Sequence, residues 1–210
     1  MKVLILGASG LVGRNALEQT LAHPSVTEVV APTRKPLPPR SKLTNPVAEK
    51  LDLLVPEVTT WRVDSVICAM GTTIAKAGSK EAFREVDYVL PLLFARRAHR
   101  EGAETFALVS AIGASAESSF FYPRTKGEIE RDIKLVGFKS VTILRPSIIA
   151  GKRDDSRYAE GVALWLSRML APILPKKFHM NPATKIGAVL VESVVAGEPG
   201  CHYRYAESLT

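Results

Sequence analysis

The chain has 210 residues, of which 28 are Lys or Arg and 21 are Asp or Glu, so its formal net charge is +7. Hydrophobic residues make up 46% of the chain, which excludes a disordered or fibrous protein and is ordinary for a soluble globular one. A chain of this length can bury one substantial core, so we expect a single domain spanning 1–210. Its basic residues occur in short doublets, which argues against a nucleic-acid-binding arm.

Metal proteins and secreted proteins are also disfavoured. The only cysteines are Cys68 and Cys201, and neither they nor the four histidines have the spacing of a metal site. The first apolar run reaches Gly7 after four residues, which is too short for the apolar core of a signal peptide. We therefore expect no metal and a cytoplasmic location. No apolar segment is long enough to predict a membrane span.

The N-terminal residues predict a strand, a tight turn and a helix. An apolar run at 3–6 stops at a glycine, and 11–22 carries apolar residues at helical spacing. A second apolar run at 26–31 follows within a few residues. These segments form a β-α-β unit, in which the two strands must be parallel and the crossover right-handed.

The same alternation continues along the chain. Strand-like stretches occur at 64–70, 105–110 and 140–145, with helix-like stretches at 79–101 and 122–136 between them. Alternation of this kind predicts an α/β fold, a Rossmann-like doubly wound parallel sheet with helices on both faces.

Two parts of the chain depart from this rhythm. Prolines interrupt 35–58, where we expect only one short third strand, near 47–51. We expect a Rossmann core over 1–150 and a small C-terminal substrate or cap region over 151–210. This region contains helical patterns at 160–171 and 182–196.

A glycine-rich turn lies between the first predicted strand and helix. Its spacing is G-x-x-G-x-x-G, at Gly7, Gly10 and Gly13. Residues without a Cβ let backbone N–H groups approach a pyrophosphate, which then sits at the positive end of the helix dipole. This context predicts dinucleotide binding in preference to a glycine turn without a ligand. The residues expected to hold the dinucleotide here are Gly7, Ser9, Gly10, Leu11, Val12, Gly13 and Arg14.

The type of dinucleotide depends on the end of the second predicted strand. An Asp or Glu about 20 residues after the turn would bind the ribose 2′-hydroxyl of NAD, but this chain has Thr33, Arg34 and Lys35 there. Arg14 can reach the same place. A guanidinium can grip a 2′-phosphate through two charge-assisted hydrogen bonds, so the pattern favours NADP(H). A solvated basic loop is the alternative interpretation.

Several motifs together resemble a known family. GASGLVGR, the pair Tyr122-x-x-x-Lys126 and Arg145-Pro146 resemble those of short-chain dehydrogenases/reductases. CAMGTT at 68–73, AGSKEAFREVDYVL and FYPRTKGEIE at 121–130 are similar to the atypical branch that includes the HIV Tat-interacting protein 2 type and its bacterial relatives. The similarity spans nearly the whole chain. It implies a Rossmann sheet, a nicotinamide cofactor and a reduced C-terminal substrate region.

Tyr122 and Lys126 are candidates for acid/base chemistry. They are four residues apart, so on a helix they share one face, and a nearby ammonium lowers the pKa of a phenol. The resemblance implies that Tyr122 is the general acid or base at the substrate oxygen and that Lys126 also holds the nicotinamide ribose. In the alignment we prefer, the third hydroxyl of the family falls on Ala111, which leaves Ser110, one residue early, as a substitute donor.

Further residues are expected along the cofactor path. Ala69, Gly71, Thr72 and Thr73 end the fourth strand, where the carboxyl edge of the sheet meets the cofactor. Ordinary turn capping is an equal alternative for the two threonines. By resemblance, Pro146 and Ile148 flank the nicotinamide.

These expectations combine into one function and one rival. The sequence favours an NADP(H)-dependent oxidoreductase of the short-chain type that reduces a carbonyl or performs an epimerase-like redox step on a small molecule. The rival is a non-catalytic, NADPH-responsive regulatory or interaction protein. No nucleic-acid partner is expected, and both a monomer and a homodimer are compatible with the sequence.

Overall fold

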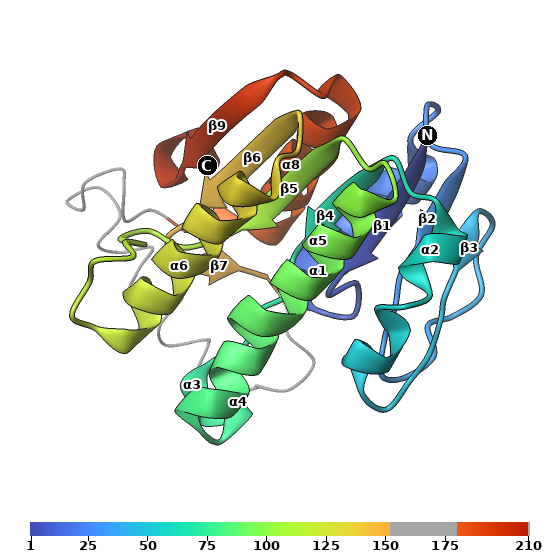
Figure 1. Ribbon diagram of the computed structural model, residues 1–210. Coiled ribbons are helices and arrows are strands. Elements are labelled where there is room, and N and C mark those ends of the chain that lie inside the picture. Colours follow the sequence, from blue (N-terminus) through green and yellow to red (C-terminus); the bar gives the residue numbers. More distant parts are fainter. Residues whose placement is uncertain (152–179, 210) are drawn as a thin grey trace.

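The computed structural model describes residues 1–151 and 180–209. Seven strands form one sheet in the order β3-β2-β1-β4-β5-β6-β9, and every neighbouring pair is parallel (Figure 1). The chain starts at β1, builds outward to β3, and returns to β4 on the other side of β1. This reversal confirms the Rossmann-like doubly wound α/β fold. The strands are β1 (Lys2–Leu6), β2 (Glu28–Val30), β3 (Leu43–Thr44), β4 (Ser65–Cys68), β5 (Thr105–Val109), β6 (Ser140–Arg145) and β9 (Gly200–Tyr205).

Helices cover both faces of this sheet. One face is packed by α1 and α8, and the opposite face by α2, α5 and α6, with α5 and α6 in front of the sheet in Figure 1. The helices are α1 (Leu11–Ala22), α2 (Val58–Trp61), α3 (Ile74–Ala77), α4 (Lys80–Arg84), α5 (Leu90–Arg100), α6 (Phe121–Val136) and α8 (Ala183–Ala196). Shorter elements are the 3₁₀ turns η1 (Leu51–Leu54) and η4 (Ala206–Leu209), the π-helical turn η2 (Glu85–Val89), and a two-stranded sheet of β7 (Ile149–Ala150) and β8 (Asn181–Pro182).

The two halves of the core follow from the alternation of side chains along each strand. In β1, Val3 and Ile5 point into the cluster that contains α1 and α8, whereas Leu4 and Leu6 point into the cluster under α5. All four are buried. Continuous apolar strands of this kind are needed because both faces of a parallel sheet are covered.

The third strand lies earlier than the sequence predicts. β3 is Leu43–Thr44, Val47 forms only a single bridge with Thr33, and Leu51 begins a 3₁₀ turn. The expectation of a strand over 47–51 is therefore wrong. Pro46 has no N–H to donate, so the ladder beside β2 stops there and resumes only at the isolated bridge.

The described residues of 151–210 add one helix and one strand to the layers of the Rossmann-like core. Helix α8 packs against α1, and β9 pairs with β6 from Gly200 to Tyr205 as the edge strand of the sheet (Figure 1). The helical pattern at 160–171 lies outside the described residues. Within 1–151 and 180–209, no helix has both the length and the apolar character that crossing a bilayer demands.

Candidate functional site

A groove runs along the carboxyl ends of β1, β4 and β5. Its larger compartment, about 970 Å³, is lined by the glycine turn and by residues 32–34 and 49–52. Its smaller compartment, about 430 Å³, is lined by the same turn together with Ser110, Tyr122 and Lys126. Both compartments share Ser9, Gly10 and residues 69–72. The turn and the Tyr-Lys pair therefore face one continuous groove.

The three glycines of the turn have different structural jobs. Gly7 has φ +84°, and a Cβ there would lie 2.7 Å from the Ala69 backbone. A Cβ on Gly13 would lie less than 3.0 Å from the Gly7 carbonyl oxygen. Gly10 instead has φ −79° and ψ 169°, and its nearest obstacle is the Gly7 oxygen at 3.3 Å. Gly7 and Gly13 are thus needed for packing, whereas Gly10 keeps the groove open.

The N-terminus of α1 opens into this groove without a side-chain cap. Gly10 is the N-cap residue, it offers no side-chain hydrogen bond, and the first turn of the helix carries no acidic residue. The first N–H groups of a helix have no intrahelical partner. This end of α1 therefore supplies free donors and the positive end of the helix dipole.

The sequence predicts a pyrophosphate at this end of α1, and Gly10→Val, whose side chain would project there, is expected to weaken dinucleotide binding at least ~100-fold. The extended backbone at Gly10 is compatible with a β-branched residue, and the Gly7 oxygen, 3.3 Å from the added Cβ, has to shift only slightly. Helix content by circular dichroism and the melting temperature should therefore stay near those of the wild type. Isothermal titration with NADPH and NADH measures the loss.

Gly13→Ala is the comparison variant for this experiment. Its Cβ collides with the turn itself, so it should lower thermal stability, which Gly10→Val should not. A folded Gly10→Val protein that binds NADPH as tightly as wild type would place the phosphate away from the turn.

After β2, Thr33 and Arg34 line the larger compartment, whereas Lys35 does not. The hydroxyl of Thr33 donates to the Lys35 carbonyl at 2.7 Å and accepts from Asn45 Nδ2 at 2.8 Å, so Thr33 contributes shape and not a free donor. Arg34 is exposed on this wall. Glu49, Lys50 and Asp52 also line the same compartment.

Lys126 and Tyr122 both line the smaller compartment, but Lys126 is buried and Tyr122 is exposed. The Tyr122 ring is 40% exposed and its centroid lies 5.7 Å from that of Phe83. Lys126 is buried, and its Nζ lies 2.7 Å from Asp87 Oδ1. Burial alone disfavours the ammonium, but the Asp87 carboxylate, with smaller help from Tyr122, outweighs burial and raises the pKa of Lys126. Lys126 is a fixed cation beside an accessible phenol.

Ser110 reaches the groove but directs its proton elsewhere. Its hydroxyl donates to Oε1 of the buried Glu130. Arg145 donates to both oxygens of the same carboxylate, from Nε at 3.0 Å and from Nη2 at 2.5 Å. This bond to Glu130 raises the pKa of Arg145. Because an ionised carboxylate only accepts hydrogen bonds, Ser110 can present only lone pairs to the groove.

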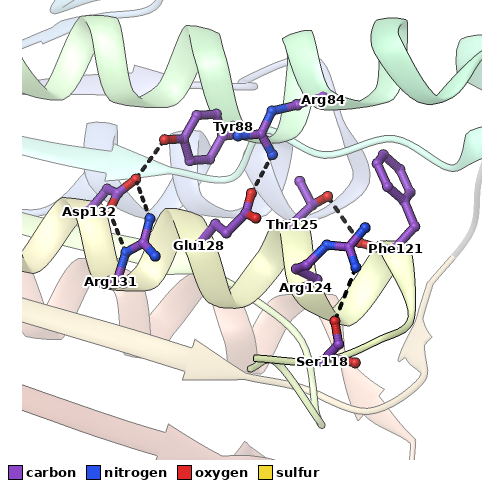
Figure 2. A network of polar contacts seen from close by, with 9 residues as sticks. All are labelled: Arg84, Tyr88, Ser118, Phe121, Arg124, Thr125, Glu128, Arg131 and Asp132. Carbon is purple, nitrogen blue, oxygen red and sulfur yellow. Dashed lines mark hydrogen bonds and ion pairs between the residues drawn. The ribbon is translucent and has the colours of Figure 1, made fainter. Parts of the chain in front are cut away.

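Helix α6 carries both Tyr122 and Lys126. Side-chain contacts connect it to two elements that precede it in the sequence, α4 and η2. Figure 2 shows Arg84 and Tyr88 reaching toward α6, where Arg84 binds Glu128 and Tyr88 Oη donates to Asp132 Oδ2 at 2.5 Å. The Arg84 guanidinium also lies 4.0 Å from the centre of the Tyr88 ring. These contacts fix the position of α6 relative to α4 and η2.

The remaining predicted residues divide into two groups. Leu11, Val12 and Arg14 line the smaller compartment, and Ala69, Gly71 and Thr72 line both. Pro146 and Ile148 line neither compartment. Their neighbour Ile149 lines the smaller one.

Sequence reasoning missed several residues of the groove. Asp87 lines the smaller compartment, Lys76 and Met70 line both, and residues 49–52 line the larger one. A carboxylate among the apolar positions of the helical segment 79–101 was the available signal for Asp87, since a buried helix face rarely carries an acid without a partner.

Cys68 offers no reactive thiol, and the described residues offer no cluster of metal ligands. Burial raises the pKa of the Cys68 thiol to about 11, so this thiol is protonated and unreactive at neutral pH. Among residues 1–151 and 180–209, no three His, Cys, Asp or Glu side chains gather closely enough to hold a metal ion.

Comparisons with known proteins give relatives and a shared fold. No family model matches the chain. Protein fmp52, mitochondrial, of Emericella nidulans is 36% identical over 180 residues, which cover 81% of this chain and 76% of the relative. Protein FMP52, mitochondrial, of Candida albicans is 31% identical over 95% of this chain and 90% of the relative. The Bordetella bronchiseptica enzyme WbmH, solved in complex with NAD⁺, has a TM-score of 0.73 at 14% identity and covers 98% of this chain and 75% of WbmH.

These relatives correct two expectations from the sequence. They are named as mitochondrial proteins, so the expectation of a cytoplasmic location is wrong and the names point to mitochondria. They carry the name Fmp52. The expected similarity to the HIV Tat-interacting protein 2 type is therefore replaced by similarity to Fmp52 proteins. The likeness to WbmH shows the Rossmann-like fold. With more than 30% identity over most of both chains, the protein belongs to the Fmp52 family.

Proposed function

We propose that the groove binds a nicotinamide dinucleotide and that the protein is an oxidoreductase acting on a small-molecule carbonyl or alcohol. The observation that carries this proposal is the continuity of the groove from the uncapped end of α1 to Tyr122 and Lys126. The residues present fit the dinucleotide, because Gly10 leaves the place of a pyrophosphate free of side chains. The similar enzyme WbmH was solved with NAD⁺.

In this proposal each compartment takes one half of the dinucleotide. The larger compartment, with Arg34 and residues 49–52, takes the adenosine half, and the first turn of α1 takes the pyrophosphate. The smaller compartment takes the nicotinamide half, with residues 69–72 along its ribose. Gly13 supports the turn from below, and Pro146 and Ile148 flank the end of the groove beside Ile149.

The acid/base chemistry falls to Tyr122. The bound dinucleotide supplies or accepts the hydride at the substrate carbon. In the direction of reduction, the Tyr122 hydroxyl donates its proton to the carbonyl oxygen, and the substrate leaves as an alcohol. The Lys126 ammonium stabilises the phenolate that remains and binds the ribose hydroxyls. In the direction of oxidation, the same phenolate removes the proton of the alcohol.

Ser110 has a narrower role than the family pattern implies. Because its proton is directed to Glu130, it accepts a hydrogen bond from a substrate hydroxyl and does not donate one to a carbonyl. Tyr122 is then the main donor to the substrate oxygen, and Ser110 orients a neighbouring hydroxyl. This arrangement favours hydroxylated substrates such as hydroxyketones or sugars over isolated ketones.

We also propose that NADP(H) is preferred over NAD(H), through Arg34. NADPH should bind at least ~10-fold more tightly than NADH, and Arg34→Ala should remove about that advantage. Tenfold is modest for a charge-assisted phosphate contact, because Arg34 is exposed and screened by solvent. Fluorescence titration of both reduced cofactors into wild type and variant measures the ratio.

Lys35→Ala is the matched control, since Lys35 neighbours Arg34 but does not line the compartment. It should leave the NADPH to NADH ratio unchanged. A wild-type preference for NADH would instead assign the ribose hydroxyls to Asp52 or Glu49 and reject the phosphate role of Arg34. Failure of both cofactors to raise the melting temperature at millimolar concentration would reject dinucleotide binding itself.

A further inference from the structure

The ion pair between Asp87 and Lys126 is the least expected feature of the groove. Both side chains are buried, and only 2.7 Å separates Lys126 Nζ from Asp87 Oδ1. Two opposite charges in a buried place need a strong reason to be there, because taking both out of water costs several kcal/mol each. The known motif of a tyrosine and a lysine four residues apart does not include this carboxylate.

The backbone around Asp87 is shaped to bring the carboxylate inward. Asp87 lies in the middle of η2, a π-helical turn between α4 and α5. Pro91, four residues later, cannot donate to the Asp87 carbonyl, and its ring would clash with that carbonyl in a regular α-helix. The local widening follows from this proline. Single π-turns of this kind occur often at functional sites.

The second oxygen of Asp87 holds the wall of the groove. Oδ2 accepts a hydrogen bond from the backbone N–H of Thr72 at 2.9 Å. A Cβ on the neighbouring Gly71 would lie 3.5 Å from Asp87 Oδ1 and 3.8 Å from Lys126 Nζ. One carboxylate therefore joins the lysine to the segment that lines both compartments.

The charge on Lys126 depends on what faces it from each neighbouring element. These groups are Asp87 on η2, Tyr122 on α6 itself, and Cys68 on β4. Cys68 is a neutral thiol at physiological pH, since burial raises its pKa to about 11. Asp87 is the only carboxylate among the three groups.

We propose that Asp87 is a positioning residue for Lys126: it keeps the lysine charged and fixes its Nζ against the groove wall at residues 71–72. This inference rests on the proposed function for what the ammonium then binds, the ribose of the nicotinamide half. The network in Figure 2 supports the same geometry, because it fastens α6 to the helical segment that carries Asp87.

Asp87→Asn tests the proposal with an isosteric change. The amide oxygen can still accept from Thr72, but the buried ammonium loses its counter-charge, so the Lys126 pKa should fall below its wild-type value. The direct readout is the ¹³Cε chemical shift of Lys126 in protein labelled with ¹³C-lysine, followed against pH without ligand. Glu104→Gln, which neutralises an exposed carboxylate outside both compartments and outside the network of Figure 2, should leave that titration unchanged.

Dinucleotide affinity gives the second readout. NADH is the probe, because it lacks the 2′-phosphate that would itself titrate. As the pH is raised from neutral to alkaline, the ratio of the Asp87→Asn to the wild-type dissociation constant should rise about 10-fold, since the variant loses its ammonium at a lower pH than wild type. A purely structural role for Asp87 would give a loss that does not depend on pH.

Each outcome decides between the proposals. A Lys126 signal that titrates alike in wild type and Asp87→Asn overturns the role of Asp87, whatever the cofactor does. If wild type binds no dinucleotide, the proposed function fails, while the ¹³Cε titration still judges the inference. If Asp87→Asn does not fold, wild type alone decides: Lys126 must stay charged up to about pH 10, and a neutral Lys126 at pH 8 overturns the proposal.

Discussion

Tyr122→Phe is expected to slow hydride transfer about 10² to 10⁴-fold while leaving dinucleotide affinity within a few fold of wild type. The change removes one hydroxyl and with it the proton that the substrate oxygen needs. The ring and its contact with Phe83 remain, so the groove keeps its shape. The measurement is single-turnover decay of NADPH fluorescence with a panel of hydroxyketones, ketones and aldehydes.

Tyr205→Phe provides the matched control, because it deletes the same hydroxyl from an exposed tyrosine on β9, outside both compartments. Its decay should match that of wild type. Equal decay in wild type and Tyr122→Phe would reject the acid role of Tyr122. Tight NADPH binding without decay on any substrate in the panel would favour the rival function, a cofactor-responsive regulatory protein.

Gly127→Ala should lower the free energy of unfolding by ~2 kcal/mol or more. In most helix interiors this substitution stabilises by up to ~1 kcal/mol. Here the added Cβ would lie less than 3.0 Å from backbone atoms of Ser115 and Ala116. The loop after β5 would have to move off α6, together with the segment that enters the groove. Urea unfolding monitored by circular dichroism measures the change.

Gly187→Ala is a graded comparison for this result. Its Cβ would meet Ala16 N and Gln19 Nε2 at 3.0 Å, a tighter fit than usual that small shifts of α1 and α8 can relieve. We expect a smaller loss than for Gly127→Ala. A Gly127→Ala protein as stable as wild type would mean that the loop at residues 115–116 yields without cost.

The parts of the fold that could be predicted are those in which local pattern and burial agree. β1, α1 and α6 lie where apolar spacing places them, because each buries a continuous stripe or run. β9 escaped prediction because an edge strand needs no such run: Cys201 and Tyr205 are exposed, and the strand starts at Gly200 with φ +105°. Its pairing with β6 depends on contacts distant in sequence.

In the site, too, the sequence predicts the motifs but not the hydrogen-bond partners of their side chains. The sequence indicated the glycine turn and the four-residue spacing of Tyr122 and Lys126, and both face one groove. It could not show where a hydroxyl points. Ser110 turned out to donate to Glu130, twenty residues away, and Thr33 to the carbonyl of Lys35. The pairing of Asp87 with Lys126 could not be predicted either, because it depends on the π-turn that brings η2 beside α6.

Helix α6 carries two buried charges one turn apart, Lys126 and Glu130, and each is balanced from a different element. Asp87 on η2 neutralises the first, and Arg145 on β6 neutralises the second. Removing a single member strands a charge in the core, whereas replacing a whole pair does not. Across the evolution of such sequences, positions 87 and 126 should therefore change together, as should 130 and 145, and intermediates with one partner altered should be rare.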